Sequence, residues 1–295
     1  MTRPHSAMHE HAPDLHGFPF SAADTRALVR AALVEDRAFD DVTTLATVPA
    51  AATARAVLAA RRAGIACGLP LAEAAFAQFD HVRVVRRCAD GAPLAPGDVL
   101  LEITGPARAL LQAERVALNY AMRLSGVASL TRRFVDAIAG TGAAILDTRK
   151  TTPGWRDLEK WAVRCGGGRN HRRDLASMAL IKDNHLAAVG GDIAHAVAAA
   201  RALLPPGAKV EVEADRIEQV GQALAAGADV IMLDNMSLEA MRQCVALVAG
   251  RATLEASGGV HLDTVRAIAE TGVDWISIGA LTHSAPALDL GLDFL

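Results

Sequence analysis

The second half of this sequence alternates short apolar runs with amphipathic segments, and no other feature constrains the fold as strongly. After Gly140, six runs of three to five residues have strand character, and the segments between them carry apolar residues at helical spacing. Such continuous apolar runs predict parallel strands that are covered on both faces by helices. The runs span residues 143–146, 178–181, 209–212, 229–233, 252–254 and 275–278.

The residues that follow each predicted strand distinguish a barrel from an open doubly wound sheet. In a (β/α) barrel the carboxyl ends of all strands converge on one mouth, whereas an open sheet gathers ligand residues at a single switch point. All six runs end in charged, polar or glycine residues, and no GxGxxG fingerprint follows the first run. The sequence therefore predicts an α/β barrel. The six strand ends carry Asp147 to Lys150, Lys182 to Asn184, Glu213, Asp234 with Asn235, Ser257 to Gly259, and Gly279 with Ala280.

The first part of the chain lacks this alternation and predicts a separate α+β domain. Ser21 and Asp24 form a capping-box pattern before a helix that extends to about Asp36. A strand, a helix and a strand follow over 53–87, then a β run over 99–103 and two helical stretches over 107–124 and 126–139. Residues 1–20 contain three prolines and four histidines and predict a flexible, solvated tail.

Composition excludes several classes of protein. Of the 295 residues 52% are hydrophobic, which argues against disorder, and the net charge of −3 argues against a nucleic-acid-binding protein. No apolar run reaches the roughly 18 residues of a membrane span. The four cysteines are scattered without a CxxC pair, which predicts a cytoplasmic protein. No motif places a base beside Cys165, so we interpret this cysteine as inert.

Glycines and cations dominate the predicted mouth. The glycines after the last two strands, in Ser257-Gly258-Gly259 and Gly279-Ala280, predict phosphate binding because backbone N–H groups can approach an anion closely there. Burying many cations without partners would be costly, so the ligand is expected to be polyanionic. The cations are Arg149, Lys150 and Lys182, with His171, Arg172 and Arg173 in the loop before the second strand.

Two carboxylates interrupt this cationic set. Glu213 and Asp234 end neighbouring predicted strands. They predict a Mg²⁺ site, because Mg²⁺ takes one or two carboxylates together with phosphate oxygens. They would also stabilise positive charge that develops on a substrate, or simply balance nearby lysines. The glycines at 166–168 predict a pliant segment that closes over a ligand or forms an anion nest.

Nine sequence motifs occur in a fixed order along the chain. They are Glu114-Arg115 through Leu118-Asn119, Leu124-Ser125-Gly126, DTRKTTPG (147–154), EKWAVRCGGGRNHR (159–172), LIKDNH (180–185), VEVE (210–213), IMLDN (231–235), EASGG (255–259) and GVDWISIGALTHS (272–284). Taken together, these motifs resemble those of the quinolinate phosphoribosyltransferase family, in the family's order and with similar spacing. The match runs from about residue 21 to the C-terminus. Trp155 replaces a usual aliphatic residue, and the loop at 35–44 lacks a glycine that is common in the family.

The resemblance implies a fold, a reaction and an assembly. The implied fold is an N-terminal α/β sandwich domain over 21–126, joined by the segment 284–295, and an incomplete TIM-like barrel over 127–283. The implied reaction transfers a phosphoribosyl group from phosphoribosyl pyrophosphate to quinolinate with decarboxylation, in NAD biosynthesis, with Mg²⁺ as cofactor. The implied assembly is a homodimer in which Arg115 reaches the partner subunit's active site.

The resemblance also implies a role for each site residue. Arg149, His171, Arg172 and Lys182 would hold the carboxylates of quinolinate. Lys150, Glu213 and Asp234 would take part in catalysis, the two acids as Mg²⁺ ligands, directly or through water. Thr148 would also bind substrate. Phosphoribosyl pyrophosphate would contact Lys150, Glu213, Asp234, Ser257, Gly258, Gly259, Ile278, Gly279 and Ala280.

Three alternatives remain open at the level of sequence. Lys150 or Lys182 at a strand end would suit a Schiff-base aldolase or lyase. A related phosphoribosyltransferase would act on another base or in molybdenum metabolism, and a non-enzymatic sensor would bind a phosphate ligand on the same scaffold.

Overall fold

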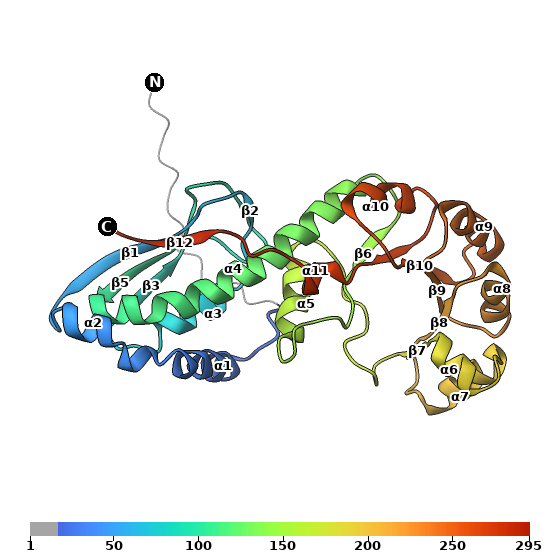
Figure 1. Cartoon of the computed structure of the whole chain (residues 1–295), viewed down its shortest axis with the longest axis horizontal. Helices are drawn as coiled ribbons and strands as arrows, with labels where there is room; N and C mark the ends of the chain where they lie inside the picture. The colour runs from blue at the N-terminus through green and yellow to red at the C-terminus, as the bar shows by residue number, and fades with distance from the viewer. Residues whose placement is uncertain (1–16) are drawn as a thin grey trace, which may run out of the picture. The chain divides into compact units, whose positions relative to one another are not determined.

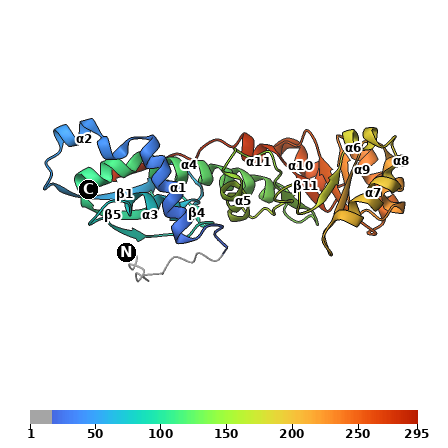
Figure 2. The same ribbon diagram turned by 90° about the horizontal axis from the view of Figure 1, so that it is seen from below.

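The computed structural model describes residues 17–295, which divide into two compact units. The first unit contains the described residues up to 126 and residues 287–295, and the second contains residues 127–286. Figures 1 and 2 show the elements of both units. Residues 1–16 of the predicted tail lie outside the described residues.

The first unit is built on an antiparallel sheet of four strands in the order β12-β1-β5-β3. The last strand of the chain lies beside the first, with Phe294 opposite Ala56. Ser21 caps the first helix by accepting the N–H of Asp24 at 3.1 Å, as the capping-box pattern predicts. The sheet strands are β1 (Thr53–Ala60), β3 (Arg83–Arg86), β5 (Val99–Pro106) and β12 (Leu290–Phe294). The other elements are α1 (Ala22–Glu35), η1 (Ala38–Asp40), α2 (Val42–Thr47), α3 (Leu69–Phe76) and the paired short strands β2 (Gly64–Ile65) and β4 (Pro93–Leu94).

Helix α4 (Ala107–Ala137) is continuous, although the sequence pattern predicts two helical stretches. The predicted break falls at Ser125-Gly126, which lies inside the helix. Ser125 is buried, accepts the N–H of Cys67 at 2.9 Å and donates to the carbonyl of Cys67 at 3.1 Å. A glycine within a helix costs about 1 kcal/mol relative to alanine, and packing routinely outweighs a cost of that size.

The second unit contains the six predicted strands in one parallel sheet, in the order β6-β11-β10-β9-β8-β7. The five later strands are neighbours in sequence order, and the first strand pairs with the last. This cyclic order is that of a barrel that stays open between β6 and β7, which confirms the predicted incomplete TIM-like barrel. The strands are β6 (Ala144–Leu146), β7 (Ala179–Ile181), β8 (Val210–Ala214), β9 (Val230–Asp234), β10 (Thr253–Ser257) and β11 (Trp275–Ser277).

Helices connect these strands and cover the sheet. Because of this cover, β8 and β9 are buried along nearly their whole length. Figures 1 and 2 show α7, α8 and α9 on the outer side of β8 and β9. The helices are α5 (Arg156–Cys165), α6 (Asp183–Ala188), α7 (Ile193–Leu203), α8 (Ile217–Ala225), α9 (Leu238–Val248), α10 (Leu262–Ala269) and α11 (Ala280–His283). Among the described helices, none has the length and apolarity to cross a membrane.

Two of the three glycines after α5, Gly166 and Gly168, serve close packing rather than the pliant lid expected from sequence, and the third, Gly167, has a φ of +90°. A Cβ atom on Gly166 would lie 2.4 Å from the carbonyl oxygen of Ala128, and one on Gly168 would lie 2.8 Å from Thr131 and from Val163. The chain therefore passes so near to α4 and α5 that side chains do not fit.

Candidate active site

A cavity of about 280 Å³ opens at the carboxyl ends of the parallel strands. It brings together most of the predicted site residues, which come from five different strand ends and the loop before β7. The predicted residues that line it are Thr148, Arg149, Lys150, His171, Arg172, Lys182, Glu213, Asp234, Ser257 and Gly258. The cavity is also lined by Asn235, which the sequence places at a strand end, and by Leu180, Met232, Glu255 and Ser277, which no sequence argument assigned to the site.

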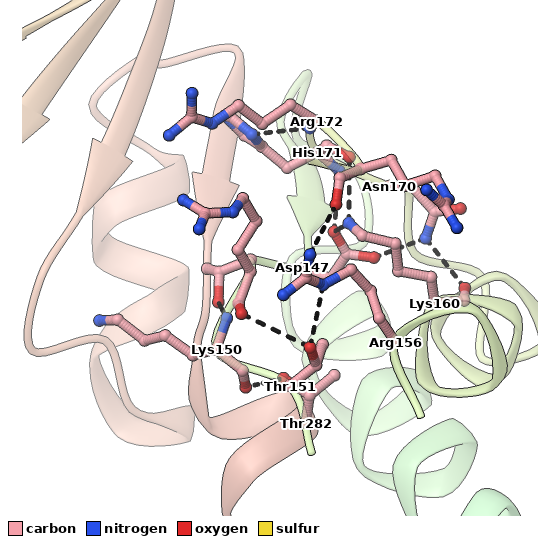
Figure 3. Close-up of polar contacts among 12 residues, drawn as sticks. Asp147, Lys150, Thr151, Arg156, Lys160, Asn170, His171, Arg172 and Thr282 are labelled. Carbon is pink, nitrogen blue, oxygen red and sulfur yellow. Dashed lines mark hydrogen bonds and ion pairs between the residues drawn. The ribbon is translucent and has the colours of Figure 1, made fainter. Parts of the chain in front are cut away.

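Asp147, directly after β6, organises one wall of the cavity from within the protein (Figure 3). Its buried carboxylate accepts Lys160 Nζ at 2.5 Å, the backbone N–H of His171 at 2.8 Å and the side-chain amide of Asn170 at 2.5 Å. Lys160 also donates to the carbonyl of His171 at 3.0 Å. Burial raises the pKa of Asp147 and lowers that of Lys160, and the attraction between the two opposes both shifts. This network fixes the backbone that carries His171 into the site.

His171 has two buried carboxylates at one ring nitrogen. Its Nε2 lies 3.1 Å from an oxygen of Glu211 and 3.1 Å from an oxygen of Glu255, and neither oxygen has ideal hydrogen-bond geometry, since one N–H faces two acceptors. Burial would lower the pKa of His171, but the two carboxylates outweigh it and raise the pKa above its ordinary value. The backbone N–H of Arg172, which donates to Nδ1 at 2.8 Å, opposes a second ring hydrogen at that atom. Burial raises the pKa of Glu211.

Two arginines lie at the cavity with few protein anions to neutralise them. Within the described part of the chain, the buried Nε of Arg149 has no hydrogen-bond partner. Arg172 donates from Nη1 to the carbonyl of Met178 at 3.0 Å, and burial and the charge of Arg149 lower its pKa. This pair of guanidinium groups is a ready site for an anion.

Lysine and acid residues occupy the next strand ends. Lys182, after β7, forms an ion pair with Glu213 on β8. Asp234 ends β9 and accepts the side-chain amide of Asn235 at 2.9 Å. Both acids line the same cavity. The arrangement offers cations and carboxylates side by side at one mouth.

The two glycine loops differ in what they contribute. Gly258 has a φ of +93°, and a Cβ there would lie 2.2 Å from Asn235 Oδ1, so only glycine fits beside that side chain. Gly279 lies against Lys150, where a Cβ would meet Lys150 Cδ at 2.8 Å. The residues that line the cavity do not include Gly259, Ile278, Gly279 or Ala280.

Arg115 is exposed on α4 and belongs to the first unit, so it is not among the lining residues of this cavity. Cys165 ends α5 and does not line the cavity either.

The residues that sequence reasoning missed share a recognisable signal. Glu211 and Glu255 are acidic residues inside strands that are otherwise apolar, and each stands two positions before a predicted site residue. Alternate residues of a strand face the same side, so Glu211 shares the face of Glu213 on β8, and Glu255 shares that of Ser257 on β10. Asp147 and Lys160 are charged residues of the same kind, in segments whose neighbours are buried.

Two family models match the chain and together cover most of it. The model described as the quinolinate phosphoribosyl transferase N-terminal domain matches residues 41–125, and the one described as the C-terminal domain matches residues 127–293.

Full-length relatives agree with these matches. A nicotinate-nucleotide pyrophosphorylase [carboxylating] of Mycobacterium leprae is 44% identical over 283 residues, which cover 93% of this chain and 98% of the relative. A probable nicotinate-nucleotide pyrophosphorylase [carboxylating] of Bacillus subtilis is 44% identical over 239 residues, covering 81% of this chain and 82% of that protein. The solved structure of nicotinate-nucleotide pyrophosphorylase from Francisella tularensis is similar, with a TM-score of 0.90, 38% identity, and coverage of 95% of this chain and 99% of that one.

Proposed function

Because the chain belongs to the quinolinate phosphoribosyltransferase family, we propose that the cavity described above is where it carries out the family's reaction. The protein transfers the phosphoribosyl group of phosphoribosyl pyrophosphate to quinolinate, with decarboxylation, in NAD biosynthesis. The products are nicotinate mononucleotide, CO₂ and pyrophosphate. The cavity is the observation that supports this proposal, because several cations line it together with Glu213 and Asp234 at one end of the barrel.

Quinolinate carries two adjacent carboxylates, which the arginine side of the cavity suits. Arg149 and Arg172 offer forked donors, and Lys182 adds a point charge beside them. Each charge-assisted contact contributes about 1.5–3 kcal/mol. His171 forms part of the same wall, next to Arg172. We assign these four residues to the binding of the quinolinate carboxylates.

Phosphoribosyl pyrophosphate is assigned to the other side of the mouth. Lys150 and Thr148 would contact it there, with Ser257 and Gly258 after β10. Gly259, Ile278, Gly279 and Ala280 do not line the cavity, and Gly279 lies against Lys150. We propose that these four residues contact phosphoribosyl pyrophosphate after their loops move on substrate binding.

The donor set of Glu213 and Asp234 fits a Mg²⁺ ion. Both acids line the cavity, and Lys182 contacts one oxygen of Glu213 while Asn235 donates to one oxygen of Asp234, so each carboxylate has a second oxygen to offer a cation. Oxygen ligands of this kind, with substrate phosphate oxygens, are those that Mg²⁺ prefers. When bound, the ion would neutralise the charge of the departing pyrophosphate.

The chain's own residues act through position and charge. They hold the pyridine nitrogen of quinolinate near C1 of the ribose, where a C–N bond forms as the bond to pyrophosphate breaks. Glu213 or Asp234 stabilises the positive charge that C1 gains in this step. The electron pair left when the 2-carboxylate departs as CO₂ stays on C2, where the adjacent quaternary nitrogen stabilises it by its positive charge until C2 takes up a proton. The cations assigned to quinolinate hold the 3-carboxylate during this step.

Arg115 enters this proposal only through a second copy of the chain. It is exposed in the first unit and absent from the lining of the cavity, as expected of a residue that is donated to a partner. We therefore propose a homodimer with shared active sites. We also propose that it works in the cytoplasm, where its four cysteines, which form no disulfide, would stay reduced.

The alternatives from sequence gain no support. An aldolase lysine must present an uncharged amine, whereas Lys182 forms an ion pair with Glu213. A sensor, or an enzyme for another base, does not account for membership of this family.

The decisive experiment supplies quinolinate labelled in its 2-carboxylate, phosphoribosyl pyrophosphate and Mg²⁺, and measures labelled CO₂ and nicotinate mononucleotide. We expect both products only when all three components are present. A Lys150→Ala variant should lose the activity, while Lys209→Ala, an exposed lysine just before β8 at the opposite end of the sheet, should keep it. Binding of both substrates without turnover, or an adduct trapped by borohydride, would contradict the proposal.

A further inference from the structure

His171, Glu211 and Glu255 form a buried cluster whose acids have no part in the mechanism above. The two glutamates are fully buried, and the His171 side chain is 7% exposed. Glu211 lies on β8 two residues before Glu213, and Glu255 lies on β10 two residues before Ser257. Each acid therefore faces the barrel interior about 6–7 Å deeper along its strand than the residue at the mouth.

The hydrogen bonds of the His171 ring identify the nitrogen that carries its hydrogen. The backbone N–H of Arg172 donates to Nδ1 at 2.8 Å, so Nδ1 must keep its lone pair. The ring hydrogen therefore lies on Nε2, which is the atom that faces the two carboxylates at 3.1 Å. A metal ion at this cluster would need the lone pair of Nε2 and a hydrogen on Nδ1, which would then oppose the N–H of Arg172. The geometry thus favours a proton over a metal ion between the ring and the acids.

The His171 ring consequently links the buried carboxylates of Glu211 and Glu255 to the backbone of Arg172. Its Nε2 is held by Glu211 and Glu255, and its Nδ1 holds the amide of the next residue. The guanidinium of Arg172 lies at the cavity beside that of Arg149, and the two repel each other. Arg172 therefore needs its backbone fixed if its charged group is to stay in place before a substrate arrives.

We propose that Glu211 and Glu255 are positioning residues for quinolinate: they hold His171 at Nε2, and through Nδ1 the ring holds Arg172 at the carboxylate site. The inference rests on the proposed function, because it takes Arg172 as a ligand of the quinolinate carboxylates. It predicts that the two acids affect quinolinate far more than phosphoribosyl pyrophosphate, because they act through His171 and Arg172, which are assigned to quinolinate.

The test replaces each acid in two ways and measures both dissociation constants by calorimetry on the full chain. Glu255→Ala and Glu211→Ala remove the acceptor, and we expect each to weaken quinolinate binding at least tenfold and to change phosphoribosyl pyrophosphate binding less than threefold. Glu255→Gln and Glu211→Gln keep an acceptor oxygen and should recover most of the loss. Asp274→Ala is the matched control, because this carboxylate accepts the N–H of Leu254 at 2.8 Å at the other end of the sheet.

Three results would overturn the proposal. These are unchanged quinolinate binding in both alanine variants, equal weakening for both substrates, and equal loss in the glutamine and alanine variants. The tautomer supplies a measurement that needs no variant: in ¹⁵N-histidine-labelled wild-type protein, the His171 resonances should show a protonated Nε2 and an unprotonated Nδ1. The opposite tautomer would refute the link to Arg172. If wild-type protein fails to bind quinolinate, the proposed function fails, and the tautomer still decides whether this link exists.

Discussion

Lys160 and Asp147 form an ion pair that is buried within the second unit, with 2.5 Å between Nζ and Oδ1. Removing one partner leaves the other as an uncompensated buried charge, which costs about 3–5 kcal/mol. We expect Lys160→Met to lower the free energy of unfolding by that amount in urea titrations. Arg173→Ala, which removes the exposed pair between Arg173 and Asp157, should cost less than about 1 kcal/mol. Equal losses in the two variants would show that burial adds nothing to the first pair.

The proposed sharing of active sites between subunits predicts complementation. Arg115→Ala and Lys150→Ala homodimers should each be nearly inactive, because each lacks one component of every site. A mixed dimer contains one site with both residues intact. Mixing the two variants, with subunit exchange followed by mass spectrometry, should restore about a quarter of wild-type activity if exchange is statistical and the sites are independent. Complete exchange without recovery would contradict the shared site.

The acids at the mouth should serve catalysis more than the binding of quinolinate. We expect Glu213→Ala combined with Asp234→Ala to abolish CO₂ release and the stimulation by Mg²⁺, while quinolinate binding measured by calorimetry changes much less. The exposed pair Glu239→Ala and Glu270→Ala provides a control with the same change in net charge. Equal loss of binding and turnover would instead assign Glu213 and Asp234 to charge balance.

Gly258 should be intolerant of any side chain. An added Cβ would lie 2.2 Å from Asn235 Oδ1, and the φ of +93° is strained for other residues. We expect Gly258→Ala to weaken phosphoribosyl pyrophosphate binding and to lower the melting temperature. Gly221→Ala lies within α8, where nothing approaches within 4 Å, and should raise stability by about 0.5–1 kcal/mol. If Gly258→Ala changed neither phosphoribosyl pyrophosphate binding nor the melting temperature, the loop would be shown to accommodate a side chain.

The fold was largely predictable because its pattern is repeated. Each of the six apolar runs corresponds to a strand, and the polar residues after them lie at one end of the sheet. The break expected near Ser125 is absent, because the contact of Ser125 with Cys67, far away in sequence, holds the helix together. Local pattern cannot reveal such a contact.

The candidate site was predictable where charges follow strands and not where they lie inside them. Glu211 and Glu255 were overlooked because strand positions were treated as core, and a buried acid has a meaning only when its partner His171 is known. Conversely, the glycines at 166–168 suggested an anion site from composition alone, whereas their closeness to Thr131 explains them as packing. Contacts between distant segments decide both cases.

The pairing of β6 with β11 places Ala144 opposite Trp275. Asp147, which binds Lys160, Asn170 and His171, stands directly after β6. During synthesis this edge strand leaves the ribosome long before the strand that completes its ladder. Until translation is almost finished, the nascent chain can therefore offer β6 only the bridge between Leu146 and Arg169 and no partner strand. A premature stop codon that removes only β11 and the residues beyond it would leave every cation of the mouth encoded, yet β6, from which Asp147 follows, would have no partner strand.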